Sequence, residues 1–543
     1  MGPMGGNAKG GSTVSPSQLR GMLRDGGEVA VLDAREEASF AEEHLLLATC
    51  LPLSRLELEA GRLLPRRDVR VVWCDAGEGL AERAAARLRG FGYSRVSALA
   101  GGVPAWRDGG LPVYSGVDVP SKAFAEVVEH ACGTPWISAE ELNRRLSRKD
   151  DVAVFDSRSF EEFHANSIPT AISAPGAELV YRVGGLVTSP DTLVVVNCGG
   201  RTRSIVGAQA LISAGLPNRV VSLKDGTMGW HLAGLPVERG AERRAPAPTA
   251  EDGARASAAA QRLAERVGVR TIEPETLRRW LGERDRRCLY VLDVRSPEEY
   301  AAGHMPGAVG VAGGQLVQET ENWIAVLNAR VVLVDDPLLA RARITAVWLR
   351  QMGWKDVVVL PWRAEADGVE RGPHRSEPLG WAALDGSAAA PIGPAELNDL
   401  VGRGGAVVVD VGSSKRHRAG HVPGAHFAVR ARLLQRLDRL PPASVLVLTS
   451  EDGRLARFAA AELAAATATP VRWLDGGADA WIAAGLPLEK GLERLADEPD
   501  DVWYAPRDRL ANLEEGMRAY LEWEVALAEQ VGRDGDSKFE MLL

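Results

Sequence analysis

The sequence predicts an α/β protein of four tandem modules, each a parallel sheet flanked by helices, followed by a C-terminal helical tail. Two observations carry most of this prediction. A short apolar run that ends in aspartate recurs four times, at Asp33, Asp156, Asp293 and Asp410. A second apolar run follows each one, ending at Cys74, Cys198, Asp335 and Thr449 or Ser450. Helix-like segments separate these runs, and such alternation favours parallel strands covered by helices on both faces.

A third marker closes three of the four repeats and helps to fix their boundaries. A glycine-containing turn leads to a tryptophan and then to Gly-Leu-Pro, with the tryptophans at Trp106, Trp230 and Trp481. We therefore predict modules 1 to 4 at residues 12–116, 136–240, 269–365 and 388–490. We predict linkers at 117–135 and 241–268, a loop-like connection before module 4, and the tail at 491–543.

The tail carries apolar residues at helical spacing, which predicts an amphipathic helix. These residues are Leu513, Met517, Leu521, Val525 and Ala528. We expect this helix to dock on module 4 or on a neighbouring module. A partner-binding or dimer helix is the alternative.

Composition and charge exclude several classes of function. The chain has 543 residues, 45% of them hydrophobic, and a net charge of -9, so it offers no electrostatic case for nucleic acid or an anionic membrane. No apolar run reaches the roughly 18 residues that span a bilayer. The N-terminus shows no secretory signal, and the five cysteines have no metal-binding spacing. We expect a cytoplasmic protein with reduced thiols and neither metal nor cofactor.

Module 2 contains the strongest candidate site, a strand–loop–helix unit over residues 194–205. A β-branched run ends at Cys198, and Gly199, Gly200, Arg201, Thr202, Arg203 and Ser204 follow. A short loop between a parallel strand and a helix directs its backbone N–H groups at its centre. Amide donors and arginine charge favour a thiolate and suit an anionic substrate, so we expect Cys198 to be activated.

The combined motifs resemble the rhodanese (thiosulfate sulfurtransferase) family. The likeness lies in the Asp-x-Arg pairs, the Ile-Pro or His-x-Pro-Gly turns, the strand–Cys–loop–helix unit and the glycine-to-tryptophan closing motif. The resemblance covers nearly the whole chain up to about residue 490. The chain is similar to large bacterial rhodanese-related sulfurtransferases built of tandem modules. The resemblance implies that a cysteine takes a sulfane sulfur from a donor such as thiosulfate. The persulfide then passes this sulfur to cyanide or a thiol.

Specific roles follow for the residues of module 2. Cys198 is the predicted nucleophile. The backbone of Gly199, Gly200, Thr202 and Ser204 would cradle the persulfide, and Arg203 and Arg201 would bind the donor's oxygens. Three further residues are candidates for support, namely Asp156, Arg158 and Lys224. The partners would be a small anionic donor and a thiophilic acceptor.

The other modules offer weaker candidates. Cys74 of module 1 is a second candidate nucleophile, although its loop carries Asp75 and Glu78 and no arginine. In module 3 the equivalent residue is Asp335, and a carboxylate cannot carry sulfane sulfur. In module 4 it is Thr449 or Ser450, with the register open by one residue. Modules 3 and 4 are therefore expected to be structural or docking modules.

Two other functions compete with sulfur transfer. A tandem scaffold or sensor without catalysis is the alternative. A Cys-dependent phosphatase is less favoured. Those enzymes carry a Cys-x5-Arg motif, in which arginine lies six positions after the cysteine, whereas Arg203 lies only five positions after Cys198.

Overall fold

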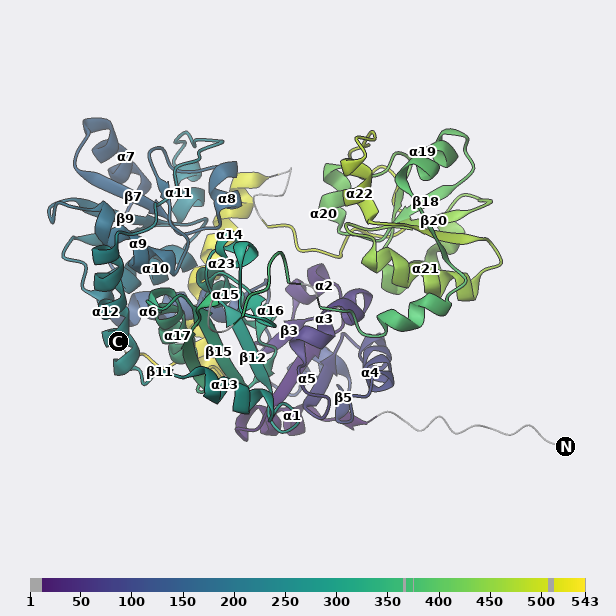
Figure 1. The fold of residues 1–543 in the computed structure, drawn as a ribbon, viewed down its shortest axis with the longest axis horizontal. Coiled ribbons are helices and arrows are strands. Elements are labelled where there is room, and N and C mark those ends of the chain that lie inside the picture. Colours follow the sequence, from purple (N-terminus) through teal and green to yellow (C-terminus); the bar gives the residue numbers. More distant parts are fainter. Residues whose placement is uncertain (1–11, 365–367, 375, 506–511, 543) are drawn as a thin grey trace.

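The chain folds into four parallel sheets flanked by helices, as predicted, in a computed structural model that describes residues 12–364, 368–374, 376–505 and 512–542. Some predicted segments lie outside these residues: residue 365 of module 3, residues 506–511 and 543 of the tail, and the N-terminal residues 1–11. The modules lie in separate regions of the ribbon, with module 4 to the right of the others (Figure 1).

Modules 1 and 2 share one strand order. The strands of module 1 run β1 (Thr13–Val14), β5 (Val96–Leu99), β4 (Arg70–Cys74), β2 (Val29–Asp33), β3 (Ala48–Cys50). Those of module 2 run β6 (Trp136–Ile137), β10 (Val220–Leu223), β9 (Leu193–Asn197), β7 (Val152–Asp156), β8 (Ile172–Ser173). In each sheet the two apolar runs recognised in the sequence are central neighbours, which brings their C-terminal ends together.

Modules 3 and 4 repeat this order. The strands of module 3 run β11 (Arg270–Thr271), β16 (Val357–Pro361), β15 (Arg330–Asp335), β12 (Leu289–Asp293), β13 (Val309–Gly310). Those of module 4 run β17 (Ala390–Ile392), β21 (Val471–Leu474), β20 (Leu446–Thr449), β18 (Val407–Asp410), β19 (His426–Phe427). Strand β14 (Val326–Leu327) of module 3 instead pairs antiparallel with β2, so the sheet of module 1 includes a strand from another module.

Helices cover both faces of these sheets. Modules 1 and 2 contribute α1 (Pro16–Arg24), α2 (Glu37–Glu42), α3 (Leu56–Leu63), α4 (Leu80–Gly90), α5 (Gly102–Asp108), α7 (Ala139–Arg148), α8 (Phe160–Ala165), α9 (Glu178–Leu186), α10 (Thr202–Ala214) and α11 (Gly226–Leu232). Modules 3 and 4 contribute α13 (Pro274–Leu281), α14 (Pro297–Ala302), α15 (Gly313–Gln318), α16 (Thr320–Trp323), α17 (Ala340–Gln351), α19 (Pro394–Gly402), α20 (Ser414–Ala419), α21 (Arg454–Ala466) and α22 (Gly477–Ala483). Short 3₁₀ turns complete the set: η1 (Leu53–Arg55), η2 (Trp381–Gly386) and η3 (Arg430–Arg439).

The segments predicted as linkers contain helices packed between modules. Helix α6 (Val119–Cys132) packs on α10, and α12 (Ala250–Arg266) packs on α9 and α17. Their apolar faces join one large hydrophobic cluster that extends through modules 1, 2 and 3, whereas module 4 has clusters of its own. The first three modules therefore form one continuous core.

The tail forms a helix, α23 (Leu513–Asp534), which packs on α6 and also contacts α11. The helix therefore docks mainly on the linker helix between modules 1 and 2 and on module 2, away from module 4 (Figure 1). Its buried face contains Met517, Leu521 and Leu527, but Val525, predicted to share that face, is 45% exposed. The prediction for Val525 was wrong because the buried stripe follows positions 517, 521, 524, 527 and 531.

Candidate functional site

One residue in each module occupies the same point of the loop after the second central strand, which we call the loop position. Its carbonyl accepts a hydrogen bond from the segment after the last core strand, at 2.8 Å in modules 1, 2 and 4 and 2.9 Å in module 3. The four residues are Asp75, Cys198, Asp335 and Ser450. The sheet register agrees, because Cys74, Asn197, Val334 and Thr449 all pair with the aspartates of the neighbouring strands.

The closing glycine of the motif explains how this loop is held. Gly226 has a φ of +55°, and a β-carbon there would lie 2.4 Å from the carbonyl oxygen of Cys198. Gly102 and Gly477 approach the carbonyls of Asp75 and Ser450 in the same way, at 2.3 and 2.2 Å. Only glycine tolerates both this backbone conformation and this approach. The motif seen in the sequence is therefore a support for the loop position.

Cys198 is the one loop-position residue with a thiol, and the loop surrounds it with polar groups. Its side chain faces the Ser204 hydroxyl, with 3.5 Å between Sγ and Oγ, and the Ser204 backbone N–H also faces the sulfur. The Ser204 hydroxyl in turn donates to the Arg201 carbonyl at 2.8 Å. The residue is only 2% exposed. Of the loop residues predicted to cradle the sulfur, Ser204 is the one whose hydroxyl and backbone N–H both lie beside it.

The ionisation of Cys198 differs from the predicted activation. Burial raises the pKa of the Cys198 thiol above its ordinary value. The positive charge of Arg203 and the hydrogen bonds from Ser204 oppose this rise in pKa, while the carboxylate of Glu524 adds to it. Desolvation outweighs the donors of the loop, so the net effect on the pKa is opposite in direction to the predicted activation.

Arg203 lies beside the sulfur but already has a carboxylate partner. Its guanidinium donates to both carboxylate oxygens of Glu162, at 2.6 and 3.1 Å. Glu162 is itself fixed by the capping box that starts α8, in which the Ser159 hydroxyl accepts from the Glu162 backbone N–H. Arg203 also lines the cavity in front of the loop. An anionic donor would have to share this guanidinium with Glu162.

The structure contradicts the predicted donor-binding role of Arg201. The side chain is 7% exposed and points to α6, where it donates to Glu126 at 2.6 and 2.8 Å and to Glu129. Asp225 accepts a third interaction at 3.3 Å. These carboxylates satisfy the guanidinium away from the cavity, so Arg201 anchors the loop to the linker helix instead.

Of the other predicted loop residues, one lines the cavity and two contact neighbouring segments. Gly199 lines the cavity, whereas Gly200 is covered by Met228, Tyr520 and Glu524. The Thr202 hydroxyl donates to Glu524 Oε1 at 2.5 Å. Tyr520 and Glu524 were not predicted as site residues, because they lie more than 300 residues beyond the loop. The one available signal was a glutamate at helical spacing between Leu521 and Leu527.

Two of the three predicted supporting residues lie under the loop. Arg158 donates to both oxygens of Asp156, at 2.9 and 2.7 Å, and Asn197 Nδ2 donates to Asp156 at 2.9 Å. This buried group joins the ends of the two central strands. Lys224 does not take part, because its ammonium lies over the exposed Trp136 ring at 4.8 Å. The interpretation of Lys224 as a support was therefore wrong.

A cavity of about 520 Å³ opens in front of the Cys198 loop. Module 2, module 3 and the tail all line it, with both charge signs and apolar surface represented by Lys122, Arg203, Glu319, Met228, Met517 and Tyr520. This volume falls in the usual range of small-molecule sites, which is roughly 300–1,000 Å³.

The alignment of Cys74 with Cys198 was wrong by one residue. Cys74 ends strand β4 and packs in the apolar cluster of module 1, where burial raises the pKa of its thiol well above the ordinary value. Asp75 holds the loop position, and its carboxylate accepts from the backbone N–H groups of Gly77, Gly79 and Ala81 at 2.9–3.0 Å. The amide cradle of module 1 therefore holds a carboxylate. The spacing was the signal, since Asp75 and Cys198 both lie 42 residues after their aspartates (75 minus 33; 198 minus 156).

Modules 3 and 4 carry closed versions of the loop. Asp335 Oδ2 accepts from the Ala342 N–H at 2.9 Å, and the buried Arg341 donates to Asp335 Oδ1 at 3.0 Å. In module 4 the register places Ser450 at the loop position, where its Oγ accepts from the Ala456 N–H at 3.1 Å. Neither module presents a thiol at this point, as the sequence analysis expected.

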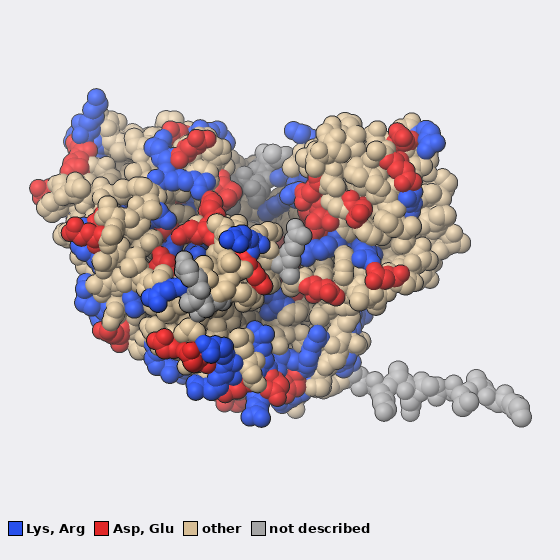
Figure 2. Space-filling model, viewed as in Figure 1, with Lys and Arg blue, Asp and Glu red and all other residues tan. Residues whose placement is uncertain are grey.

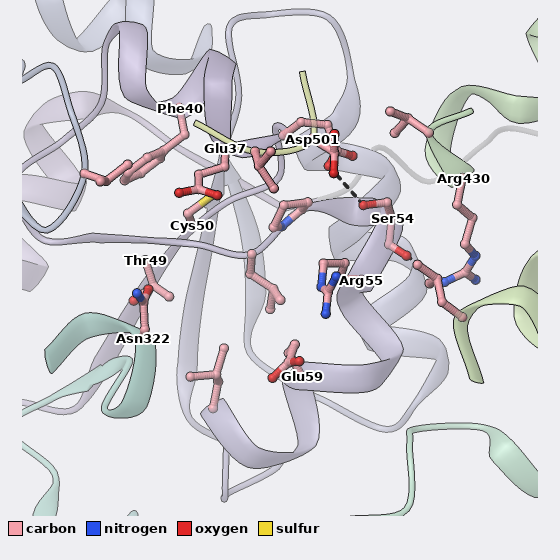
Figure 3. A pocket seen from close by; sticks show the side chains of 18 of the residues that line it. Glu37, Phe40, Thr49, Cys50, Ser54, Arg55, Glu59, Asn322, Arg430 and Asp501 are labelled. Atoms are coloured by element: carbon pink, nitrogen blue, oxygen red, sulfur yellow. Dashed lines mark hydrogen bonds between the residues drawn. The ribbon is translucent and has the colours of Figure 1, made fainter. Parts of the chain in front are cut away.

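A second cavity, of about 340 Å³, lies between modules 1, 3 and 4 (Figure 3). The figure shows Glu37 and Cys50 on one side and Ser54, Arg55 and Arg430 on the other. Acidic side chains outnumber basic ones in its lining, and burial raises the pKa of Glu36 to about 8. Cys50 donates weakly to the Arg35 carbonyl at 3.8 Å. This cavity belongs to the junction between modules rather than to a loop position with a thiol.

Within the described part of the chain, no group of three or more His, Cys, Asp or Glu side chains could hold a metal ion. None of the helices described combines the length and apolar character needed to cross a bilayer. On the face shown in Figure 2, basic and acidic side chains are interspersed.

The comparisons with known proteins agree with the four-module fold. The rhodanese-like domain model matches residues 15–108, 138–233, 273–362 and 393–484, one match for each module. The chain therefore belongs to the rhodanese family.

Several of the individual matches are sulfurtransferases. The crystal structure of thiosulfate sulfurtransferase from Pseudomonas aeruginosa is 45% identical, with a TM-score of 0.92 over 98% of this chain and 99% of that one. An HTH-type transcriptional regulator of Mycobacterium tuberculosis is 38% identical over 103 residues, and 3-mercaptopyruvate sulfurtransferase of Escherichia coli is 31% identical over 186 residues. These matches cover 19% and 29% of this chain, and only 44% and 63% of those two relatives.

Proposed function

We propose that this chain is a sulfurtransferase in which Cys198 of module 2 carries a sulfane sulfur from thiosulfate, or a similar donor, to cyanide or a thiol. The observation that carries the proposal is that Cys198 is the one thiol among the four loop positions. The likeness over the full length to a thiosulfate sulfurtransferase supports the choice of donor. All five cysteines are free, which supports action in a reducing compartment such as the cytoplasm.

The proposed chemistry takes two displacement steps. The Cys198 thiolate attacks the outer sulfur of thiosulfate, the S–S bond of the donor breaks, and sulfite leaves with the bonding pair. The acceptor then attacks the terminal persulfide sulfur, and the Cys198 thiolate is regenerated. The Ser204 backbone N–H lies where it can stabilise the persulfide anion, and Arg203 faces the cavity that would admit the donor.

The decisive experiment is mass analysis after treatment with thiosulfate, which should add about 32 Da for one sulfur atom. Cys198→Ser should abolish this gain and reduce thiocyanate formation to background. Cys74→Ser is the matched control, because its thiol is buried in a strand, and it should retain both. Loss of persulfide in Cys74→Ser alone would show that module 1 carries the sulfur.

A non-catalytic scaffold or sensor is the second candidate. The observation that favours it is the resting site, where the thiol is 2% exposed and the Arg203 guanidinium already pairs with Glu162. Failure of the wild-type chain to gain a sulfur atom from thiosulfate or from organic sulfane donors would favour this function.

A further inference from the structure

The tail helix α23 completes the wall around the Cys198 loop. It packs on α6, and Trp523 lies against Gly116, so the linker between modules 1 and 2 sits beneath it. Tyr520 and Glu524 face the loop, since a β-carbon on Gly200 would lie 3.1 Å from Glu524 Oε2 and 3.6 Å from Tyr520 Cε1. Two side chains from the far end of the chain therefore border the predicted nucleophile.

Glu524 is an unusual residue to find at this position. It is 1% exposed and lies on the buried face of the helix, between Leu521 and Leu527. Its Oε1 accepts from the Thr202 hydroxyl, but its Oε2 has no hydrogen-bond partner among the described residues. A buried carboxylate without full compensation costs stability, and such groups occur preferentially at functional sites.

The pairing of the charges around the loop determines how the Glu524 carboxylate affects an anionic substrate. Of the two loop arginines, Arg203 is held by Glu162, and Arg201 by Glu126 and its neighbours. Lys122 on α6 is the other cation near Glu524, and it also interacts with Asp118 at 3.3 Å. Burial raises the pKa of Glu524, and the charges of Lys122 and Arg201 oppose this rise. Neither loop guanidinium forms an ion pair with Glu524 among the described residues, so in its ionised form this carboxylate presents a negative charge near the sulfur to an incoming anion.

Resting on the sulfur transfer proposed above, we propose that Glu524 is a specificity-determining residue of the Cys198 site. Its charge disfavours dianionic sulfur donors relative to donors that carry one negative charge or none. The preferred donor class would then be organic sulfane-sulfur compounds of low charge. Thiosulfate, a dianion, would be a working but disfavoured member of the donor set.

The first test compares two donors that differ by one charge. Methanethiosulfonate transfers its outer sulfur as thiosulfate does, and leaves methanesulfinate, but it carries a single negative charge. Glu524→Gln keeps an oxygen that can accept from Thr202 and removes the charge. It should raise kcat/KM for thiosulfate by at least about threefold more than for methanethiosulfonate, mainly through KM. Glu522→Gln, on the exposed face of the same helix, is the matched control and should leave the ratio unchanged.

The second test needs no sulfur transfer, so it separates failure of this proposal from failure of the proposed function. Iodoacetamide and iodoacetate alkylate the same thiolate but differ in charge, and peptide mass analysis reports the reaction at Cys198. The wild-type chain should favour iodoacetamide, and Glu524→Gln should reduce this preference by at least about threefold.

The rate ratio in the wild-type chain provides a check that does not depend on a variant folding. Because the thiolate fraction cancels from the ratio, preference for iodoacetamide should fall as Glu524 is protonated at lower pH. The other charged or titratable groups near Glu524 and the thiol are Lys122, Glu126, Arg201, Arg203 and Tyr520. An equal ratio for both reagents at all pH values, or the same ratio in wild type and Glu524→Gln, would overturn the proposal.

Discussion

At the scale of single residues, the chemistry of each module depends on what occupies one loop position. The surrounding backbone is repeated, and the occupant is a carboxylate in modules 1 and 3, a hydroxyl in module 4 and a thiol in module 2. Oxygen at this position accepts the loop N–H groups and closes the cradle. Sulfur is a weak acceptor, so Cys198 leaves those donors available for a persulfide anion.

The pH dependence of Cys198 is a prediction at this scale. Because burial raises the pKa of its thiol, alkylation of Cys198 by iodoacetamide should accelerate about tenfold per pH unit through the neutral range. Arg203 lowers that pKa, so Arg203→Gln should shift the profile to higher pH. The exposed Arg219→Gln serves as the control. A rate that is already constant at neutral pH would contradict the buried-thiol geometry.

At the scale of elements, the repeated units preserve contacts while exchanging the residues that make them. In modules 1 to 3 an arginine two residues after the strand aspartate forms the buried ion pair, as Arg158 does with Asp156. Module 4 has Gly412 at this point. There His417 Nδ1 lies 2.8 Å from Asp410, and its ring stacks on His421 at 3.7 Å. A different side chain from the following helix α20 thus satisfies the same carboxylate.

Replacement of His417 should show whether it stabilises Asp410 as the arginines stabilise the equivalent aspartates of modules 1 to 3. His417→Phe restores the aromatic type found in the other modules but leaves the Asp410 carboxylate short of a partner. We expect a loss of about 2 kcal/mol in the free energy of unfolding, measured by chemical denaturation. The double variant Asp410→Asn with His417→Phe should lose less, because no charge is then left unpaired. Equal losses in both variants would show that the ring packing, not the pair, is the stabilising contact.

At the scale of the whole molecule, the modules are joined by buried polar contacts as well as by a shared core. Arg430 of module 4 is fully enclosed and donates to Glu57 and to the Ser54 carbonyl of module 1, at 2.7 and 2.9 Å. Beside this contact lies the acidic cavity of Figure 3, where burial raises the pKa of both Glu36 and Glu321 to about 8. At neutral pH the Glu36 and Glu321 carboxyls of the junction therefore keep protons that they would lose on unfolding.

The stability of the junction should consequently fall as pH rises. A carboxyl with a pKa of 4.5 unfolded and about 8 folded keeps its proton in the folded state between these values. Each such group lowers the free energy of unfolding by about 1.4 kcal/mol per pH unit across that window, and stability is retained below pH 4.5. Glu36→Gln should flatten the pH dependence between pH 6 and 8, measured by denaturant unfolding. Glu42→Gln, which is exposed, should keep the wild-type slope.

Much of the fold could be predicted because its signals are local and repeated. Apolar strands ending in aspartate, the glycine-to-tryptophan motif and their regular spacing all report contacts within one module. The placement of Cys74 failed because residue identity was preferred to spacing. A slip of one residue along a strand moves a side chain to the opposite face of the sheet, and Cys74 accordingly lies in the core.

The sequence by itself determined the four modules, the family and the choice of Cys198 as the candidate nucleophile, since each depends on residues close together in the chain. Only the tertiary structure decided which charges surround that sulfur. Arg201 turns to Glu126 on the linker helix, Arg203 pairs with Glu162, and Glu524 arrives from the tail. Such pairings join distant segments, and their electrostatic effect depends on burial and on distances that no local pattern encodes.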